Sequence, residues 1–231
     1  MSDFKGFSPD TFMLLELNKF NDNRDFYESV KEDIKKMAIV PMRQIASDLS
    51  DELYRIDDKM NLVPTKMVSR IRRDTRFSKN KEMYRANVWC MFMRDKHIWH
   101  NQPCMWFEYF PDSYSYGVGT FRVDTAYLET FRRVLRDNQQ LFKRALSSVE
   151  ITGAIPFVDC FKKDKPGIED IDDELRAFYN SRGFHFVYTG TEMKKLIDGS
   201  ILQELTYAIR AFEPMYKFLI MVGDELIKNG D

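Results

Sequence analysis

Residues 70–85 have the sequence Arg70-Ile-Arg-Arg-Asp-Thr-Arg-Phe-Ser-Lys-Asn-Lys-Glu-Met-Tyr-Arg85, and no other part of the chain is so unbalanced in charge. Seven of these residues are lysine or arginine and two are acidic, whereas the whole 231-residue chain has a formal net charge of −1. A local positive field of this size favours either an anionic partner or a set of arginine–carboxylate pairs. The stretch is therefore the first candidate for a functional centre.

The composition around this stretch is that of an ordinary globular protein, with 44% apolar and 31% charged residues. A chain with a net charge near zero is not expected to bind nucleic acid over its whole surface, so any nucleic-acid contact would be local. No apolar run approaches the roughly 20 residues that span a bilayer, and the first residues do not have the pattern of a secretory signal. Three cysteines without a Cys-x-x-Cys pair are typical of reduced thiols. We expect a cytoplasmic protein with no membrane partner.

Hydrophobic periodicity predicts a helical N-terminal quarter, in which Pro41 either kinks one helix or starts a second. Alternating or β-rich segments predict strands, and further apolar stripes predict helices, the last of them disturbed by Pro214. We expect one α+β domain over residues 1–231, with a mostly antiparallel sheet packed by N-terminal and C-terminal helices. The expected strands are 66–73, 86–94, 97–100, 105–110, 114–119 and 184–188, with another in 151–163. The expected later helices are 124–135, with Asp124 as N-cap, a following piece at 141–146, and then 171–180, 191–198 and 201–227.

The basic stretch resembles the signature of an uncharacterised bacterial and fungal family, domain of unknown function 2461 (DUF2461). That signature reads approximately Arg-[Ile/Val]-x-Arg-Asp-x-Arg-Phe-Ser-Lys-[Asp/Asn]-Lys-x-Pro-Tyr-Lys, so this chain has Met83 in place of the proline and Arg85 in place of the lysine. Asn21-Asp-Asn-Arg-Asp-Phe-Tyr27 and Tyr116-Gly-Val-Gly119 are similar to two further segments of the family, in the same order. The resemblance implies a single cytoplasmic α+β domain. It implies no activity, since none is established for the family.

The residue types in the stretch suit an anion-binding cleft. Guanidinium groups bind phosphate or carboxylate oxygens bidentately, and lysines add point charge. We expect the ligand to be a phosphate-bearing small molecule or a nucleic-acid backbone, while no cofactor is indicated. The candidate anion-binding residues are Arg70, Arg73, Arg76, Lys79, Lys81 and Arg85, and the candidate supporting residues are Asn23, Arg24, Ser78 and Tyr84.

Two alternatives remain open on the sequence. In the first, the protein is an enzyme that acts on a phosphorylated substrate, with Asp74 as general base or metal ligand. In the second, it is an interaction module whose arginines are structural and pair with carboxylates of the N-terminal helices. Those carboxylates are Asp48, Asp51, Glu52, Asp57 and Asp58.

Other chemistry-bearing residues give weaker signals. His97 and His100 lie three positions apart, which on a strand places them on opposite faces, so we assign no metal site. The chain has no Gly-x-Ser-x-Gly, P-loop or Gly-x-Gly-x-x-Gly motif. The aromatic residues between positions 84 and 127 are interpreted mainly as core.

Overall fold

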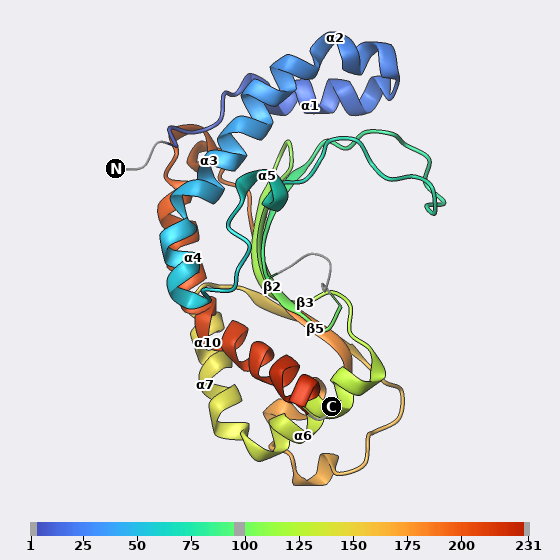
Figure 1. The fold of residues 1–231 in the computed structure, drawn as a ribbon, viewed down its shortest axis with the longest axis vertical. Helices are drawn as coiled ribbons and strands as arrows, with labels where there is room; N and C mark the ends of the chain where they lie inside the picture. Colours follow the sequence, from blue (N-terminus) through green and yellow to red (C-terminus); the bar gives the residue numbers. More distant parts are fainter. Residues whose placement is uncertain (1–3, 95–99, 229–231) are drawn as a thin grey trace. The chain divides into compact units, whose positions relative to one another are not determined.

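The computed structural model describes residues 4–94 and 100–228. In this part of the chain helices flank a five-stranded antiparallel sheet with the strand order β1-β2-β3-β5-β4 (Figure 1). The predicted α+β class is therefore confirmed. The strands are β1 (Val88–Phe92), β2 (Pro103–Tyr109), β3 (Tyr114–Thr120), β4 (Ile155–Cys160) and β5 (Ser181–Gly190).

The helices fall before and after the first three strands. None of those in the described ranges is both long enough and apolar enough to cross a bilayer. The first group is α1 (Asp10–Asn21), α2 (Arg24–Ile34), the π-helix η1 (Lys35–Ile39), α3 (Val40–Asp48), α4 (Ser50–Ile56) and α5 (Pro64–Met67). The second group is α6 (Thr125–Asp137), α7 (Gln139–Glu150), the 3₁₀ turns η3 (Ile168–Asp170) and η4 (Asp173–Leu175), α8 (Arg176–Tyr179), α9 (Met193–Asp198) and α10 (Ile201–Lys228).

The described residues group into two compact units. Unit 1 takes in the described parts of Met1–Phe92, Trp106–Ser115 and Thr189–Thr206. Unit 2 takes in the described parts of Met93–Met105, Tyr116–Tyr188 and Tyr207–Asp231.

The core of unit 1 is built by its N-terminal helices. Helix α3 packs on β1 and α5, and it buries Met42 and Ile45 completely. Helix α1 turns Phe12 toward Tyr109 of β2, with the ring centroids 5.8 Å apart and the rings nearly perpendicular. Because these faces are apolar at helical spacing, their burial drives the helices onto the strands.

The junction between α1 and α2 is set by two adjacent polar residues. Asp22 has a left-handed backbone (φ 43°) and donates its N–H to the carbonyl of Asn18, so α1 ends there. Asn23 is the N-cap of α2, since its Oδ1 accepts a hydrogen bond from the Phe26 N–H at 2.8 Å. Asn21-Asp-Asn23 thus forms the turn between α1 and α2.

Residues 66–73 do not form the regular strand that we expected. Pro64 fixes φ for a helical turn, and α5 extends to Met67. The chain then runs extended with only isolated antiparallel bridges, which pair Val68 with Cys90 and Arg72 with Tyr84. A longer ladder does not form here, because the residues beyond Arg72 have no strand face to bury.

In unit 2 a cluster of phenyl rings forms the core. Phe142 of α7 is fully buried, and its ring centroid lies 4.9 Å from that of Phe218 and 5.3 Å from that of Phe178. Phe131 and Phe184 close the cluster, at 5.9 and 6.0 Å from Phe142. Edge-to-face contacts of this kind stabilise a core beyond the apolar area that they bury.

Pro214 does not disturb the last helix as we expected. Helix α10 continues through it without a break. Met215 and Leu219 beyond it are fully buried, and the Ser148 hydroxyl donates to the Ala211 carbonyl in the preceding turn at 2.7 Å. Burial on both sides of Pro214 thus outweighs the missing backbone hydrogen bond.

Residues 171–180 also depart from the expected single helix, since they contain η4 followed by the short α8. Asp172 at the start of this segment is extended and donates its N–H to Gln139 Oε1 at 2.8 Å. The acidic residues Asp172 to Glu174, which we expected in a helix, therefore belong to the segment that leads into α8.

Replacing Phe142 with alanine is expected to lower the free energy of unfolding by about 3–5 kcal/mol, since it leaves a cavity among four rings. Leu141→Ala, at a neighbouring position that is 40% exposed, is the control and should cost less than about 1 kcal/mol. Urea denaturation of both variants measures the difference. Equal shifts in the two midpoints would contradict this description of the core.

Candidate anion-binding site

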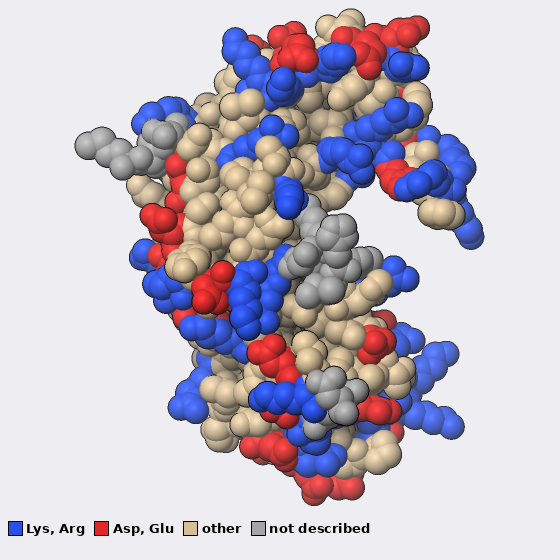
Figure 2. All heavy atoms as spheres, viewed as in Figure 1, with Lys and Arg blue, Asp and Glu red and all other residues tan. Residues whose placement is uncertain are grey.

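The basic stretch forms a hairpin that projects from the body of unit 1. We call residues 70–85 the arm. Just before the arm, the Ser69 N–H donates to the Trp89 carbonyl at 2.8 Å, and within it the Arg73 N–H donates to the Met83 carbonyl at 2.8 Å. In Figure 1 the arm is the teal hairpin on the right, and in Figure 2 lysine and arginine atoms cover much of it.

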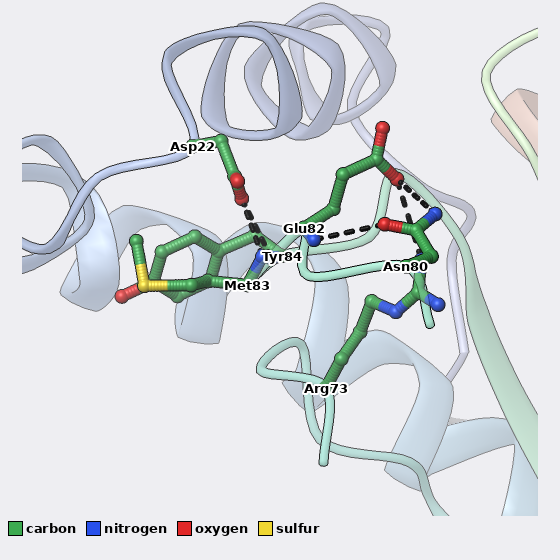
Figure 3. Close-up of polar contacts among 6 residues, drawn as sticks. All are labelled: Asp22, Arg73, Asn80, Glu82, Met83 and Tyr84. Carbon is green, nitrogen blue, oxygen red and sulfur yellow. Dashed lines mark hydrogen bonds and ion pairs between the residues drawn. The ribbon is translucent and has the colours of Figure 1, made fainter. Parts of the chain in front are cut away.

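The base of the arm is held by the Asp22 carboxylate. Its Oδ1 accepts hydrogen bonds from the Met83 N–H at 2.7 Å and the Tyr84 N–H at 2.9 Å (Figure 3). The left-handed backbone of Asp22 presents this carboxylate to the returning strand of the arm. Two segments that resemble the DUF2461 family, residues 21–27 and 70–85, are joined directly by this interaction.

Tyr84 makes a second connection between the arm and α2. Its side chain is 1% exposed, and its ring stacks on that of Tyr27 with a centroid distance of 4.6 Å and an interplanar angle of 23°. Burial raises the pKa of the Tyr84 phenol. Tyr84 therefore supports the site through Tyr27, and Asn23 supports it as the cap of α2.

A groove of about 270 Å³ lies between the base of the arm and the helices α2, η1 and α3. We call it the basic groove, because five cationic side chains and one carboxylate, Glu32, line it. Its lining residues are Tyr27, Lys31, Glu32, Ile34, Lys35, Ile39, Arg43, Ser69, Arg70, Ile71 and Arg72.

The three arginines of the basic groove form no ion pair with a carboxylate of the described residues. Arg70 and Arg72 are exposed on either side of the buried Ile71, and neither side chain hydrogen-bonds to, or forms an ion pair with, any residue in the described ranges. Arg43 Nε is buried and has no hydrogen-bond acceptor. A buried charged donor without an acceptor is costly, so an anion in the groove would stabilise this arrangement.

The two lysines of the basic groove are only weakly neutralised. Lys31 pairs with Glu28 at 2.5 Å and Lys35 with Glu32 at 3.5 Å, each from the preceding turn of the same helix. Such exposed pairs are worth little, so they do not prevent the ammonium groups from meeting a ligand. The pKa of Lys31 is raised, mainly by the hydrogen bond to Glu28, and it remains charged.

Farther out, two cations of the arm are already paired within the arm. Arg73 forms an ion pair with Glu82 at 3.3 Å (Figure 3). Arg76 donates from Nε and Nη2 to the two oxygens of Asp74, at 2.9 and 2.6 Å. The hydrogen bonds from Arg76 lower the pKa of Asp74 to about 2. An exposed carboxylate that is so weakly basic does not suit the general-base role considered for Asp74.

The remaining arm residues of the predicted set do not line the basic groove. Lys79 is exposed, Ser78 is half-buried, and the Lys81 ammonium donates to the Thr75 carbonyl at 3.0 Å. Arg24 is exposed at the start of α2. Of the six predicted anion-binding residues, the structure brings only Arg70 into the groove.

Arg85 faces the sheet. Its guanidinium lies over the Trp89 ring, 4.1 Å from the centroid, and burial lowers its pKa. Nearby, the Glu108 carboxylate accepts a hydrogen bond from Asn87, while burial raises its pKa. Arg85 thus packs as a cation–π partner on β1.

The acidic N-terminal helices do not neutralise the arm. In the described ranges, no ion pair joins a cation of the arm to a carboxylate of α3 or α4. Instead, Asp48 accepts a hydrogen bond from the Phe4 N–H, and Glu52 pairs with Arg55.

The described residues provide no cluster of side chains for a metal site. His97 lies outside the described residues, as does the expected strand 97–100 apart from His100. His185 stacks between Phe157 and Phe121, at centroid distances of 5.1 and 6.0 Å, and burial lowers its pKa. Within the described ranges no three of histidine, cysteine, aspartate and glutamate side chains cluster as a metal site would require.

The anion-binding set predicted from the sequence left out four cations of the groove, Lys31, Lys35, Arg43 and Arg72. The signal was present in part, since Lys31 and Lys35 are four residues apart and share one face of a helix. Arg43 gives no such signal, because the side of α3 on which it lies depends on where that helix begins after η1.

The fold and the groove together describe an α+β protein with a cation-rich hairpin beside a basic groove. A family model described as conserved hypothetical protein (DUF2461) matches residues 10–218. The chain belongs to this family, and the resemblance seen in the sequence is confirmed. A comparison with curated proteins finds no match.

Asp22→Ala is expected to lower the free energy of unfolding by about 1–3 kcal/mol, since two backbone N–H groups lose a charged acceptor. Asp22→Asn is the control: it keeps an acceptor oxygen and tolerates the left-handed backbone, so it should retain most of the stability. Urea denaturation compares the two. If the alanine variant unfolds at the wild-type midpoint, Asp22 does not hold the arm.

Proposed function

We propose that the protein binds a phosphate-bearing small molecule in the basic groove. The observation that carries the proposal is the convergence of Arg43, Arg70 and Arg72 without anionic partners, one of them with a buried, unsatisfied Nε. Guanidinium forks match phosphate oxygens bidentately, and such charge-assisted bonds are about twice as strong as neutral ones.

The size and lining of the basic groove support a small ligand. A volume of about 270 Å³ is at the low end for ligand sites, so a diphosphate or a small phosphate ester suits it better than a large cofactor. Ser69 lines the same groove and adds a hydroxyl, which can hydrogen-bond to a phosphate oxygen.

A nucleic-acid backbone is the less favoured ligand. It would need cations spaced along a track, and the arm is the only cation-rich track that the sequence indicates. Arg73 and Arg76, however, are engaged by Glu82 and Asp74. Arg43, Arg70 and Arg72, which form no ion pair with a described residue, instead lie together at the base of the arm.

A cytoplasmic location completes the proposal. Its support is that none of Cys90, Cys104 and Cys160 forms a disulfide within the described ranges, as is usual in a reducing compartment.

Calorimetry with inorganic pyrophosphate tests the proposed site. Arg70→Gln is expected to weaken binding about ten- to hundredfold, because one charge-assisted contact is lost. Arg144→Gln, which removes the same charge from an exposed position of α7 in unit 2, should bind as the wild type does. Rising ionic strength should weaken binding, since the contact is electrostatic.

The proposal fails if pyrophosphate and simple phosphate esters do not bind the wild type, or if both variants lose affinity equally. Binding of a single-stranded oligonucleotide that depends on Lys79 and Lys81, and not on Arg70, would indicate the nucleic-acid alternative. Turnover of a phosphate ester that Asp74→Asn abolishes would indicate an enzyme.

A further inference from the structure

Unit 1 contains a second, larger groove of opposite charge. We call it the acidic groove: about 770 Å³, lined by one face of α1, the returning strand of the arm and the loop between β2 and β3. Four carboxylates and one lysine line it together with apolar side chains. Its residues are Met13, Glu16, Leu17, Lys19, Phe20, Asp22, Glu82, Ala86, Phe110, Pro111 and Asp112.

The floor of the acidic groove is an apolar stripe that the fold leaves open. Met13, Leu17 and Phe20 lie at helical spacing on α1, away from the face that carries Phe12 into the core. They are 58%, 44% and 88% exposed. A contiguous apolar patch with a polar rim is typical of an interaction site.

The tip of the arm has the complementary character. Phe77 is 95% exposed and, with Phe20, is one of the two most exposed large apolar side chains in the described part of the chain. Lys79 and Lys81 follow it, and neither forms an ion pair with a described residue. The tip is therefore an aromatic side chain beside two cations.

In this structure the tip does not occupy the acidic groove of its own chain, since Phe77 is 95% exposed and does not line that groove. Glu82 near the end of the arm and Ala86 just after it do line the groove, and the bonds from Asp22 hold the backbone between them at residues 83 and 84. The arm tip of a second copy is not subject to this constraint and has the complementary chemistry.

We propose that the arm tip of one copy of this protein docks in the acidic groove of a second copy. Phe77 would cover Phe20 and Leu17, while Lys79 and Lys81 approach Glu16 and Asp112. A two-fold axis makes the contact twice, so each copy gives a tip and receives one. The contact area is small for a stable dimer, so association is expected to be weak and dependent on concentration and salt.

Sedimentation equilibrium tests the proposal, over about a hundredfold range of protein concentration to capture weak association. The wild type should form a dimer at the upper end. Phe77→Asp and Phe20→Asp should each abolish it, and both positions are exposed, so folding is preserved. Tyr54→Asp, at an exposed position of α4 that is 59% accessible, is the control and should dimerise as the wild type does.

Mixing the two monomeric variants provides the decisive complementation. Phe77→Asp keeps an intact groove and Phe20→Asp an intact tip, so a mixed pair retains one of the two contacts. The mixture should associate more than either variant alone and less than the wild type. A wild type that stays monomeric over the whole range, a dimer that survives either variant, or a mixture no more associated than its components would overturn the proposal.

Discussion

The Asp22 carboxylate is the constraint on which the described arrangement of unit 1 depends. The left-handed backbone of Asp22 ends α1 and is followed by Asn23, the cap of α2, while its carboxylate accepts hydrogen bonds from the backbone N–H groups of Met83 and Tyr84. This contact acts together with the burial of Ile71 and Tyr84, which packs the base of the arm against the body of unit 1. One carboxylate thus anchors the C-terminal end of the arm.

With its base held in this way, the arm borders a different groove on each side. On one side Arg70 and Arg72 meet the cations of α2, η1 and α3 and form the basic groove. On the other side Glu82 and Ala86 meet the open stripe of α1 and form the acidic groove. The arm neutralises part of its own charge through the Arg73–Glu82 and Arg76–Asp74 pairs. The functional proposals concern the cations of the arm that form no ion pair with a described residue. These are Arg70 and Arg72 in the basic groove and Lys79 and Lys81 at the tip.

The sequence predicted those features that depend on local chemistry. Charge imbalance located the arm, and β-branched and aromatic content located β1. Features set by tertiary packing were not predictable in this way. Lys31 and Lys35 looked like a solvated helix face until the arm was placed beside them, Pro64 began a helical turn where a strand was expected, and α10 ran through Pro214. The anion-binding set predicted from the sequence remains a prediction. Of its six residues, only Arg70 lines the basic groove.

The measurement that tests the central claim most directly is a crystal structure of the protein grown with pyrophosphate. The account predicts density for the anion between Arg43, Arg70 and Arg72, with Arg43 Nε donating to a phosphate oxygen and Asp22 still bound to the N–H groups of residues 83 and 84. Pyrophosphate bound elsewhere on the arm, or a basic groove that stays free of the anion at saturating concentration, would contradict it.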